Sequence, residues 1–255
     1  MDLFAMKAPV LHDSKRFAVL AADVVIFTVR DRELCVRLMR VQRPPHFPDN
    51  AGFPGALVAA DESAEDTALR IVRDRGVIAS PIHIEQLYTM SRIDRDPRGR
   101  VVAVAYLALV PWETLTDTEK ADTTNAWWEP VSNLSDLSRS SQRLRRLDSP
   151  APIALGGRLA YDHDELLDIA LKRLRSRVTY TTLMLKLMPT EFTLTELEHA
   201  YESILKTDLD KRNFRKKLQK LKLLTRLPKK RTGGKFRPAQ LYAFSTSKVK
   251  DIEVL

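Results

Sequence analysis

Apolar and polar positions alternate in blocks along the first half of the chain and predict several strands. Residues 19–30 are rich in Val, Ile, Phe and Thr, which is typical of a buried strand. A polar turn at residues 30–33 leads into a second apolar block, 34–41, and the pair predicts a β-hairpin. Further strands are predicted at 82–90 and 101–110, separated by a charged turn at 92–100.

One helix is predicted between these strands. Ser63 is a favourable N-cap for a helix over residues 64–75, and Gly76 is a suitable stop. The proline-rich stretch 44–54 is interpreted as a loop, and the stretch 132–152, rich in Ser, Arg and Pro, as an irregular connection. Strands that alternate with a helix indicate a layered α/β arrangement.

The C-terminal part predicts two short helices followed by a hairpin. Thr193 and Glu196 have the spacing of a capping box, and a second helix begins after Asp208 or Asp210. The inward-facing positions of this second helix are spaced by four and three residues: Phe214, Leu218 and Leu221. Strands at 223–227 and 240–244 flank a basic, glycine-containing tip. This order is typical of a winged helix-turn-helix.

Length and composition limit the class of protein. A chain of 255 residues with 44% hydrophobic and 29% charged residues favours two soluble units of unequal size. The apolar run 101–112 is shorter than the roughly 20 residues of a membrane span, and no secretory leader is recognised, so we expect a cytoplasmic protein without membrane contact. The single Cys35 and the scattered histidines predict neither disulfides nor a zinc site.

The positive charge lies in one short segment. Residues 206–240 contain fourteen Lys or Arg against two Asp, a balance of +12, whereas the other 220 residues carry −3 within the overall +9. This concentration predicts a module that binds a polyanion, here double-stranded DNA. A solvated lysine-rich face is the alternative, but it does not account for the basic hairpin. The predicted DNA contacts are Lys211, Arg212, Asn213, Arg215, Lys216, Lys230, Arg231, Lys235 and Arg237.

The loop and helix at residues 54–77 resemble a Nudix box in which the carboxylates are largely replaced. With Ala56 at the position of the box glycine, Glu62 and Arg70 match, but Ile71 and Arg75 stand where glutamates are expected. With Gly55 there instead, the arginine is lost and arginines occupy two glutamate positions. Hydrolysis of a diphosphate needs several carboxylates to hold Mg²⁺. We therefore predict no metal, no cofactor and no enzyme activity.

Both halves of the chain resemble one family, the Nudix-related transcriptional regulators of the NrtR type. The resemblance is carried by residues 84–90, 95–102, 105–110, 159–171, 191–197, 201–205, 210–215 and 237–244. It implies an α/β fold, a Nudix-like α/β/α sandwich followed by a C-terminal winged helix-turn-helix. The implied division is a sensing domain at 1–155, a linker helix region at 156–178 and a DNA-binding domain at 179–255.

The same resemblance implies a small-molecule effector, commonly ADP-ribose, bound by the first domain. The residues proposed for it are Arg43, Arg70, Arg95 and Arg98. For the arginines of the turn 95–100, simple solvation or contact with a partner subunit are the alternatives. His163, near a helix start, is interpreted as a capping or packing residue and less readily as a ligand.

These observations predict a homodimeric transcriptional repressor on a palindromic operator, which senses a nucleotide-sugar metabolite and controls NAD or sugar metabolism. Two alternatives remain open. One is an active Nudix hydrolase of ADP-ribose-type substrates with an accessory nucleic-acid-binding domain, and the other is a constitutive DNA-binding protein whose N-terminal domain is purely structural. Because binding and catalysis depend on different groups, a pocket can persist after the catalytic carboxylates are lost.

Overall fold

The computed structural model describes residues 17–76, 78–80, 82–135, 159–232, 238–252 and 254. Within these residues, the N-terminal part contains a seven-stranded sheet of order β3-β2-β1-β6-β5, in which β4 also pairs with β1 and β7 with β2. The strands are β1 (Val19–Arg30), β2 (Glu33–Arg43), β3 (Phe47–Gly52), β4 (Gly55–Leu57), β5 (His83–Met90), β6 (Val101–Leu109) and β7 (Ala126–Pro130). β1 and β6 run parallel and the other pairs antiparallel, so the sheet is mixed.

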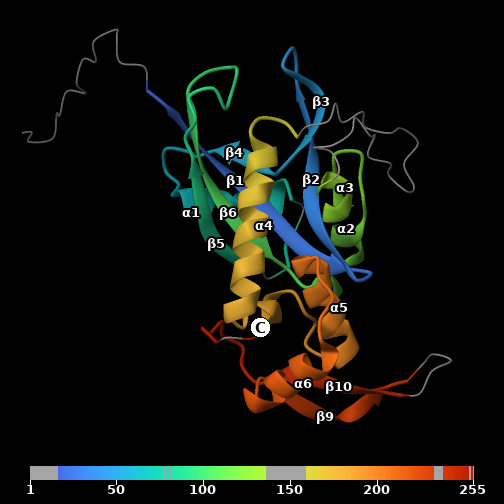
Figure 1. Ribbon diagram of the computed structural model, residues 1–255. Coiled ribbons are helices and arrows are strands. Elements are labelled where there is room, and N and C mark those ends of the chain that lie inside the picture. Colours follow the sequence, from blue (N-terminus) through green and yellow to red (C-terminus); the bar gives the residue numbers. More distant parts are fainter. Residues whose placement is uncertain are drawn as a thin grey trace, which may run out of the picture.

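Both faces of this sheet are covered, which explains the unbroken apolar runs in its central strands. Along β1, Val24 and Ile26 pack on one side with helix α1 (Ala64–Asp74), while Val25 and Phe27 pack on the other. The second side is covered by α4 (His163–Tyr180), which lies in front of the sheet in Figure 1, and at the lower edge of the sheet by α5 (Leu194–Leu205). The predicted α/β/α sandwich is confirmed.

The helix starts follow the predicted caps. The Ser63 hydroxyl accepts a hydrogen bond from the Asp66 amide at the start of α1, and Thr193 with Glu196 forms the capping box of α5. Of the two candidates for the next helix, α6 (Lys211–Lys220), Asp210 is the cap. The remaining short helices are η1 (Trp112–Thr114), α2 (Asp117–Lys120), α3 (Val131–Ser135) and η2 (Leu183–Lys186).

Three strands of the N-terminal sheet differ from the sequence-based expectation. The stretch 44–54, predicted as a loop, contains β3, which pairs with β2 from Met39↔Gly52 to Arg43↔Phe47. β3 is an edge strand, where Pro48 is tolerated because no ladder hydrogen bond is needed on the outer side. β4 and β7 were not predicted, since three and five residues are too short for a clear alternation.

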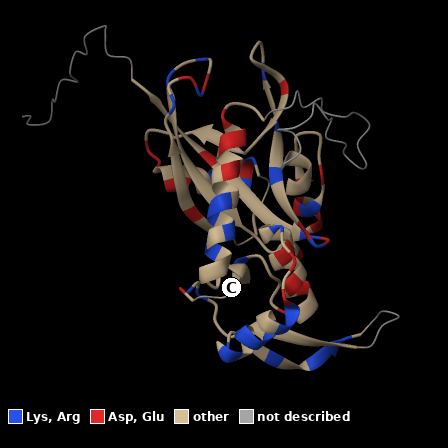
Figure 2. Ribbon diagram, in the orientation of Figure 1, with Lys and Arg blue, Asp and Glu red and all other residues tan. Residues whose placement is uncertain are grey.

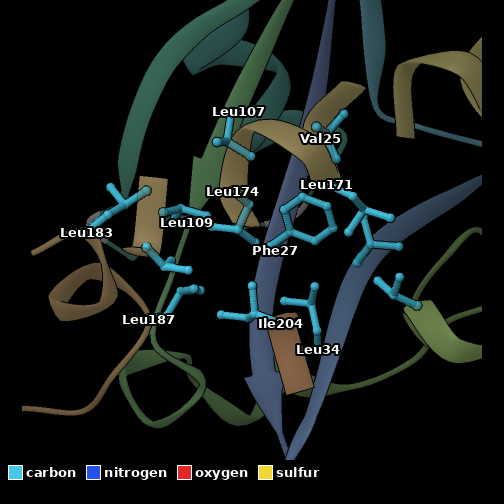
Figure 3. Packing of buried hydrophobic residues seen from close by; sticks show 14 of the residues in the cluster. Val25, Phe27, Leu34, Leu107, Leu109, Leu171, Leu174, Leu183, Leu187 and Ile204 are labelled. Atoms are coloured by element: carbon cyan, nitrogen blue, oxygen red, sulfur yellow. The ribbon is translucent and has the colours of Figure 1, made fainter. Parts of the chain in front are cut away.

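The C-terminal part is a winged helix, as predicted. Helices α5 and α6 precede the hairpin of β9 (Leu224–Arg231) and β10 (Ala239–Phe244), and β8 (Phe192–Thr193) adds a third strand in the order β8-β10-β9. One hydrophobic core joins it to the sheet: Figure 3 shows Phe27 of β1, Leu174 of α4 and Ile204 of α5 pointing toward one another. Among the described residues, no helix is long and apolar enough to cross a membrane.

Candidate functional site

A cavity of about 650 Å³ opens where β1, β2, β4, the loop 91–100 and the residues before α4 meet. Its walls are apolar at Val19, Met39, Val41, Leu57 and Val101. Its charged lining is dominated by arginines, against the two carboxylates Asp23 and Asp96: Arg40, Arg43, Arg75, Arg95, Arg98 and Arg100. A concave site with apolar walls and excess positive charge is suited to an anionic small molecule that also has an apolar part.

Arg95 lies at the floor of this cavity in a buried ion-pair network. Its Nε and Nη2 each donate to one oxygen of Asp162 at 2.9 Å, and Nη2 also donates to Asp23 Oδ2 at 3.0 Å. Burial alone raises the pKa of Asp23, but hydrogen bonding to His163 and the charges of His163 and Arg95 outweigh burial and hold that pKa below its usual value. The Asp23 carboxylate is therefore ionised at neutral pH, as its ion pair with Arg95 requires.

Arg98 and Arg43 are the more accessible of the predicted effector residues. Arg98 forms two hydrogen bonds with Asp96, at 2.9 and 2.7 Å, and its guanidinium lies 5.4 Å from the centre of the Tyr161 ring. Arg43 is exposed at the cavity rim, where its Nη1 donates to the carbonyl of Gln42. The structure thus brings Arg43, Arg95 and Arg98 together around one cavity.

Arg70 lies outside the cavity lining, on α1, where it is paired with Glu62. Nε and Nη2 of Arg70 each donate to a different Glu62 oxygen at 2.7 Å, and Thr67 Oγ1 donates to the same carboxylate at 2.9 Å. These contacts, led by the Arg70 hydrogen bonds, lower the pKa of Glu62 to about 2. Glu62 is thus paired with the neighbouring side chains of Arg70 and Thr67. Among the described residues, no cluster of three or more His, Cys, Asp or Glu could hold a metal ion.

His163 is a packing residue that also reaches the cavity. Its side chain is 2% exposed, its Nδ1 accepts a hydrogen bond from the Phe53 amide at 2.9 Å, and its ring stacks on Phe53. Asp23 and Tyr161 also line the cavity, although neither was predicted as a site residue. Asp23 is the single acidic residue within an apolar strand, and this could have drawn attention to it. Tyr161 carries no comparable signal in the sequence.

Helix α6 is rich in basic residues (Figure 2), and most of them are exposed. Lys211, Arg212 and Lys216 are exposed, and within the described part of the chain none of them has an ion-pair partner. Arg215 differs, because it donates at 2.5 and 3.0 Å to Glu198 of α5, a residue that is 1% exposed. Asn213 Nδ2 donates to Asp210 at 2.7 Å and so strengthens the helix cap.

The first strand of the wing continues this basic surface. Lys230 is exposed on β9, while Lys229 pairs with Glu191 at 2.6 Å and Arg231 pairs with Glu196. These pairs attach the wing to the start of α5. Lys235 and Arg237, which were also predicted to contact DNA, lie outside the described residues.

Known proteins are similar to this chain both in the winged helix and over most of its length. Residues 184–244 match the family model of the NrtR DNA-binding winged helix domain. An ADPR-responsive transcriptional repressor of Acinetobacter baylyi is 30% identical over 231 residues, which cover 89% of this chain and 82% of that repressor.

Solved structures agree with this relationship. Shewanella oneidensis NrtR, in complex with a 27mer DNA, is 31% identical with a TM-score of 0.70 and covers 89% of this chain and 93% of its own. A MutT/nudix family protein from Enterococcus faecalis is 26% identical with a TM-score of 0.67, over 91% and 89% of the two chains. Since these similarities extend over the sheet domain and the winged helix in the same order, the chain belongs to the NrtR family of Nudix-related transcriptional regulators.

Proposed function

We propose that this protein is a DNA-binding transcriptional repressor whose Nudix-like domain binds ADP-ribose or a closely related nucleotide sugar. The observation that carries the proposal is one continuous hydrophobic core between an arginine-lined cavity and an exposed basic helix. Through this core, the domain that can bind an anionic metabolite packs directly against the domain that can bind DNA. The proposed division is sensing at 1–155, linkage at 156–178 and DNA binding at 179–255.

The cavity chemistry favours a diphosphate joined to less polar groups. Arg43 and Arg98 can each bind two phosphate oxygens, because a guanidinium group is suited to bidentate contact with an oxyanion. The apolar wall that includes Val19 and Leu57 suits the face of a base or sugar. The Acinetobacter relative is named as ADPR responsive, which supports ADP-ribose as the first ligand to test.

We infer that the domain binds this ligand without hydrolysing it. In the box helix Ile71 and Arg75 occupy positions where the family of hydrolases places glutamates, and Glu62 is held by Arg70 and Thr67. A diphosphate bound by arginines needs no metal to neutralise its charge. The relatives named as transcriptional regulators support the same conclusion.

On DNA, we propose that α6 enters the major groove and β9 follows the flanking backbone. Lys211, Arg212 and Lys216 are the proposed contacts from α6, because their side chains are exposed and have no ion pair within the described residues. Lys230 is the proposed wing contact. A homodimer on a palindromic operator would place two such helices on successive major grooves.

The effector proposal is tested by thermal unfolding of the protein with and without ADP-ribose, with affinities from calorimetry. At 100 times its dissociation constant the ligand should stabilise the protein by about 2.7 kcal/mol. Arg98→Ala should weaken binding by roughly tenfold or more, since a charge-assisted hydrogen bond is lost. The matched control is Arg70→Ala, which removes an arginine outside the cavity lining and should leave the affinity within about threefold. Absence of stabilisation in the wild type contradicts the proposal.

A further inference from the structure

The start of α4 forms part of the cavity wall and is joined to the loop 91–100 by a buried contact. Arg95 of this loop donates to both oxygens of Asp162, the residue that precedes α4, and to Asp23 of β1. The Arg95 and Asp162 side chains are only 4% and 3% exposed. Removing one partner of so buried a pair leaves an uncompensated charge, so the pair fixes the two elements to each other.

The chain enters α4 in a constrained conformation. Tyr161, whose ring lines the cavity, has a φ of 60°, a left-handed conformation that is costly for an aromatic residue. On either side, the Ala160 amide donates to the Ala51 carbonyl and His163 accepts from the Phe53 amide. Contacts at the cavity therefore determine how the first turn of α4 is placed.

The other end of α4 contacts the winged helix directly. Arg175 Nε donates at 2.9 Å to the carbonyl of Ile204 in the last turn of α5. Leu174 and Val178 are fully buried in the core that also contains Ile204. A helix of 18 residues spans about 27 Å, and a close-packed helix shifts as a unit more easily than it deforms. Helix α4 therefore connects the cavity to α5, which precedes α6 in the winged helix (Figure 1).

We propose that the Arg95–Asp162 pair is the positioning contact through which ligand in the cavity controls DNA binding. This inference rests on the proposed function. An anionic ligand competes with Asp162 for the N–H groups of Arg95, because both are oxyanions at the same guanidinium. When Arg95 turns to the ligand, Asp162 loses its partner, α4 shifts, and the winged helices of a dimer leave the spacing that the operator requires.

The molecule offers a matched control for this contact. Arg92 of the same loop pairs at 3.3 Å with Glu165 in the first turn of α4, but the two side chains are 57% and 48% exposed. An exposed pair contributes little and is screened by salt. Glu165→Gln therefore removes a carboxylate that joins the same two elements without disturbing the buried contact.

The test measures both affinities in wild type, Asp162→Asn and Glu165→Gln. The DNA probe is a duplex selected by the wild-type protein from a random-sequence library, followed by fluorescence anisotropy, and the ligand probe is ADP-ribose, followed by calorimetry. Asp162→Asn should weaken DNA binding by at least about fivefold in the absence of ligand, while ADP-ribose binds equally or more tightly, because the two equilibria are linked. General damage to the fold would weaken both.

The response to ligand completes the test. Saturating ADP-ribose should weaken DNA binding of wild type and Glu165→Gln by roughly tenfold or more, and that of Asp162→Asn by less than about threefold. If Asp162→Asn does not fold, Asp162→Ser also removes the carboxylate, keeps a residue type that is common at helix N-caps, and should give the same pattern. An Asp162→Asn protein with a wild-type response overturns the inference and leaves the proposed function intact. If the wild-type protein does not bind ADP-ribose, or if ADP-ribose does not change its affinity for DNA, both the inference and the proposed function are wrong.

Discussion

Arginine side chains around the cavity differ in whether a carboxylate already holds them. Arg95 and Arg98 are paired with aspartates, whereas Arg43, Arg75 and Arg100 have no carboxylate partner among the described residues. A phosphate gains most from a guanidinium whose charge is not already neutralised. At the residue scale, the structure thus separates arginines that are ready for an anion from those that must exchange a partner to bind one.

We predict that the purified protein with Mg²⁺ or Mn²⁺ does not hydrolyse ADP-ribose above background. The reason is chemical: Glu62 is engaged by Arg70 and Thr67, and the positive charge of Arg70 disfavours a cation beside it. Phosphate release after addition of a phosphatase measures the activity. A turnover near about 1 per second, an ordinary enzyme value, that disappears in Glu62→Gln would contradict this prediction and support the hydrolase alternative.

On α6, the neighbouring residues Arg212 and Asn213 should have different roles. Arg212→Ala is expected to weaken operator binding by roughly 1 to 3 kcal/mol and to relax sequence preference, because Arg212 is exposed in the first turn of the helix. Asn213→Ala should have a smaller effect, since its amide is bonded to Asp210. Anisotropy on the selected duplex and on single-base variants of it measures both. Wild-type affinity and preference in Arg212→Ala would mean that another face of the helix meets the DNA.

At the scale of the elements, the sequence predicts best where local signals agree with packing. The strand 19–30, the helix from Ser63 and the capping box of Thr193 were predictable, because apolar periodicity and cap chemistry point to the same boundaries. β3 was not, since Pro48 and the flanking prolines signal a loop and only pairing with β2 makes this segment a strand. The contact between Arg95 and Asp162 in the cavity was not predictable either. These two residues are 67 positions apart in the sequence, and no local pattern encodes such a contact.

The short helix α2 provides a test of stability at this scale. Glu119, which is 4% exposed, accepts hydrogen bonds from the amides of Ala79, Ser80 and Thr116 and so ties α2 to the segment after α1. Burial raises the pKa of Glu119, but these hydrogen bonds outweigh it and lower the pKa to about 2. We expect Glu119→Gln to reduce the free energy of unfolding by roughly 2 to 3 kcal/mol at neutral pH.

The pH dependence of this difference has a definite sign. Because the pKa of Glu119 is lowered from 4.5 in the folded state, its contribution is complete above pH 4.5 and is lost as the pH falls toward 2. Urea unfolding of wild type and Glu119→Gln from about pH 7 to about pH 3 measures the difference between their free energies of unfolding. This difference should stay constant near neutral pH and decrease only as the solution becomes acidic. If this difference in free energy is the same at every pH, the lower stability of Glu119→Gln results from changed packing and not from loss of the carboxylate charge.

At the scale of the whole molecule, charge and function separate along the chain. The segment 206–240 carries +12 and the other 220 residues −3. In Figure 2, basic residues gather on α6 and β9, and acidic residues on α5. Such an uneven distribution attracts the molecule to DNA through one end only, which leaves the cavity domain free of the polyanion. We therefore expect the affinity to depend on salt and, in the proposed dimer, on the spacing of the two half-sites.

A dimer should show this dependence in two measurable ways. If each subunit places roughly three to five cations against phosphates, the logarithm of the binding constant should fall with log salt at a slope of about −5 to −9, and a monomer should give about half of that. Two-fold symmetry also requires inverted half-sites about one helical turn apart, so inserting about 5 base pairs should turn one α6 away from its groove. Anisotropy across salt concentrations, on native-spaced and half-turn-shifted duplexes, measures both, with a full-turn insertion as the control that restores the facing. A slope shallower than about −3, or indifference to the half-turn shift, would favour a monomer or a non-specific binder over a symmetric dimer.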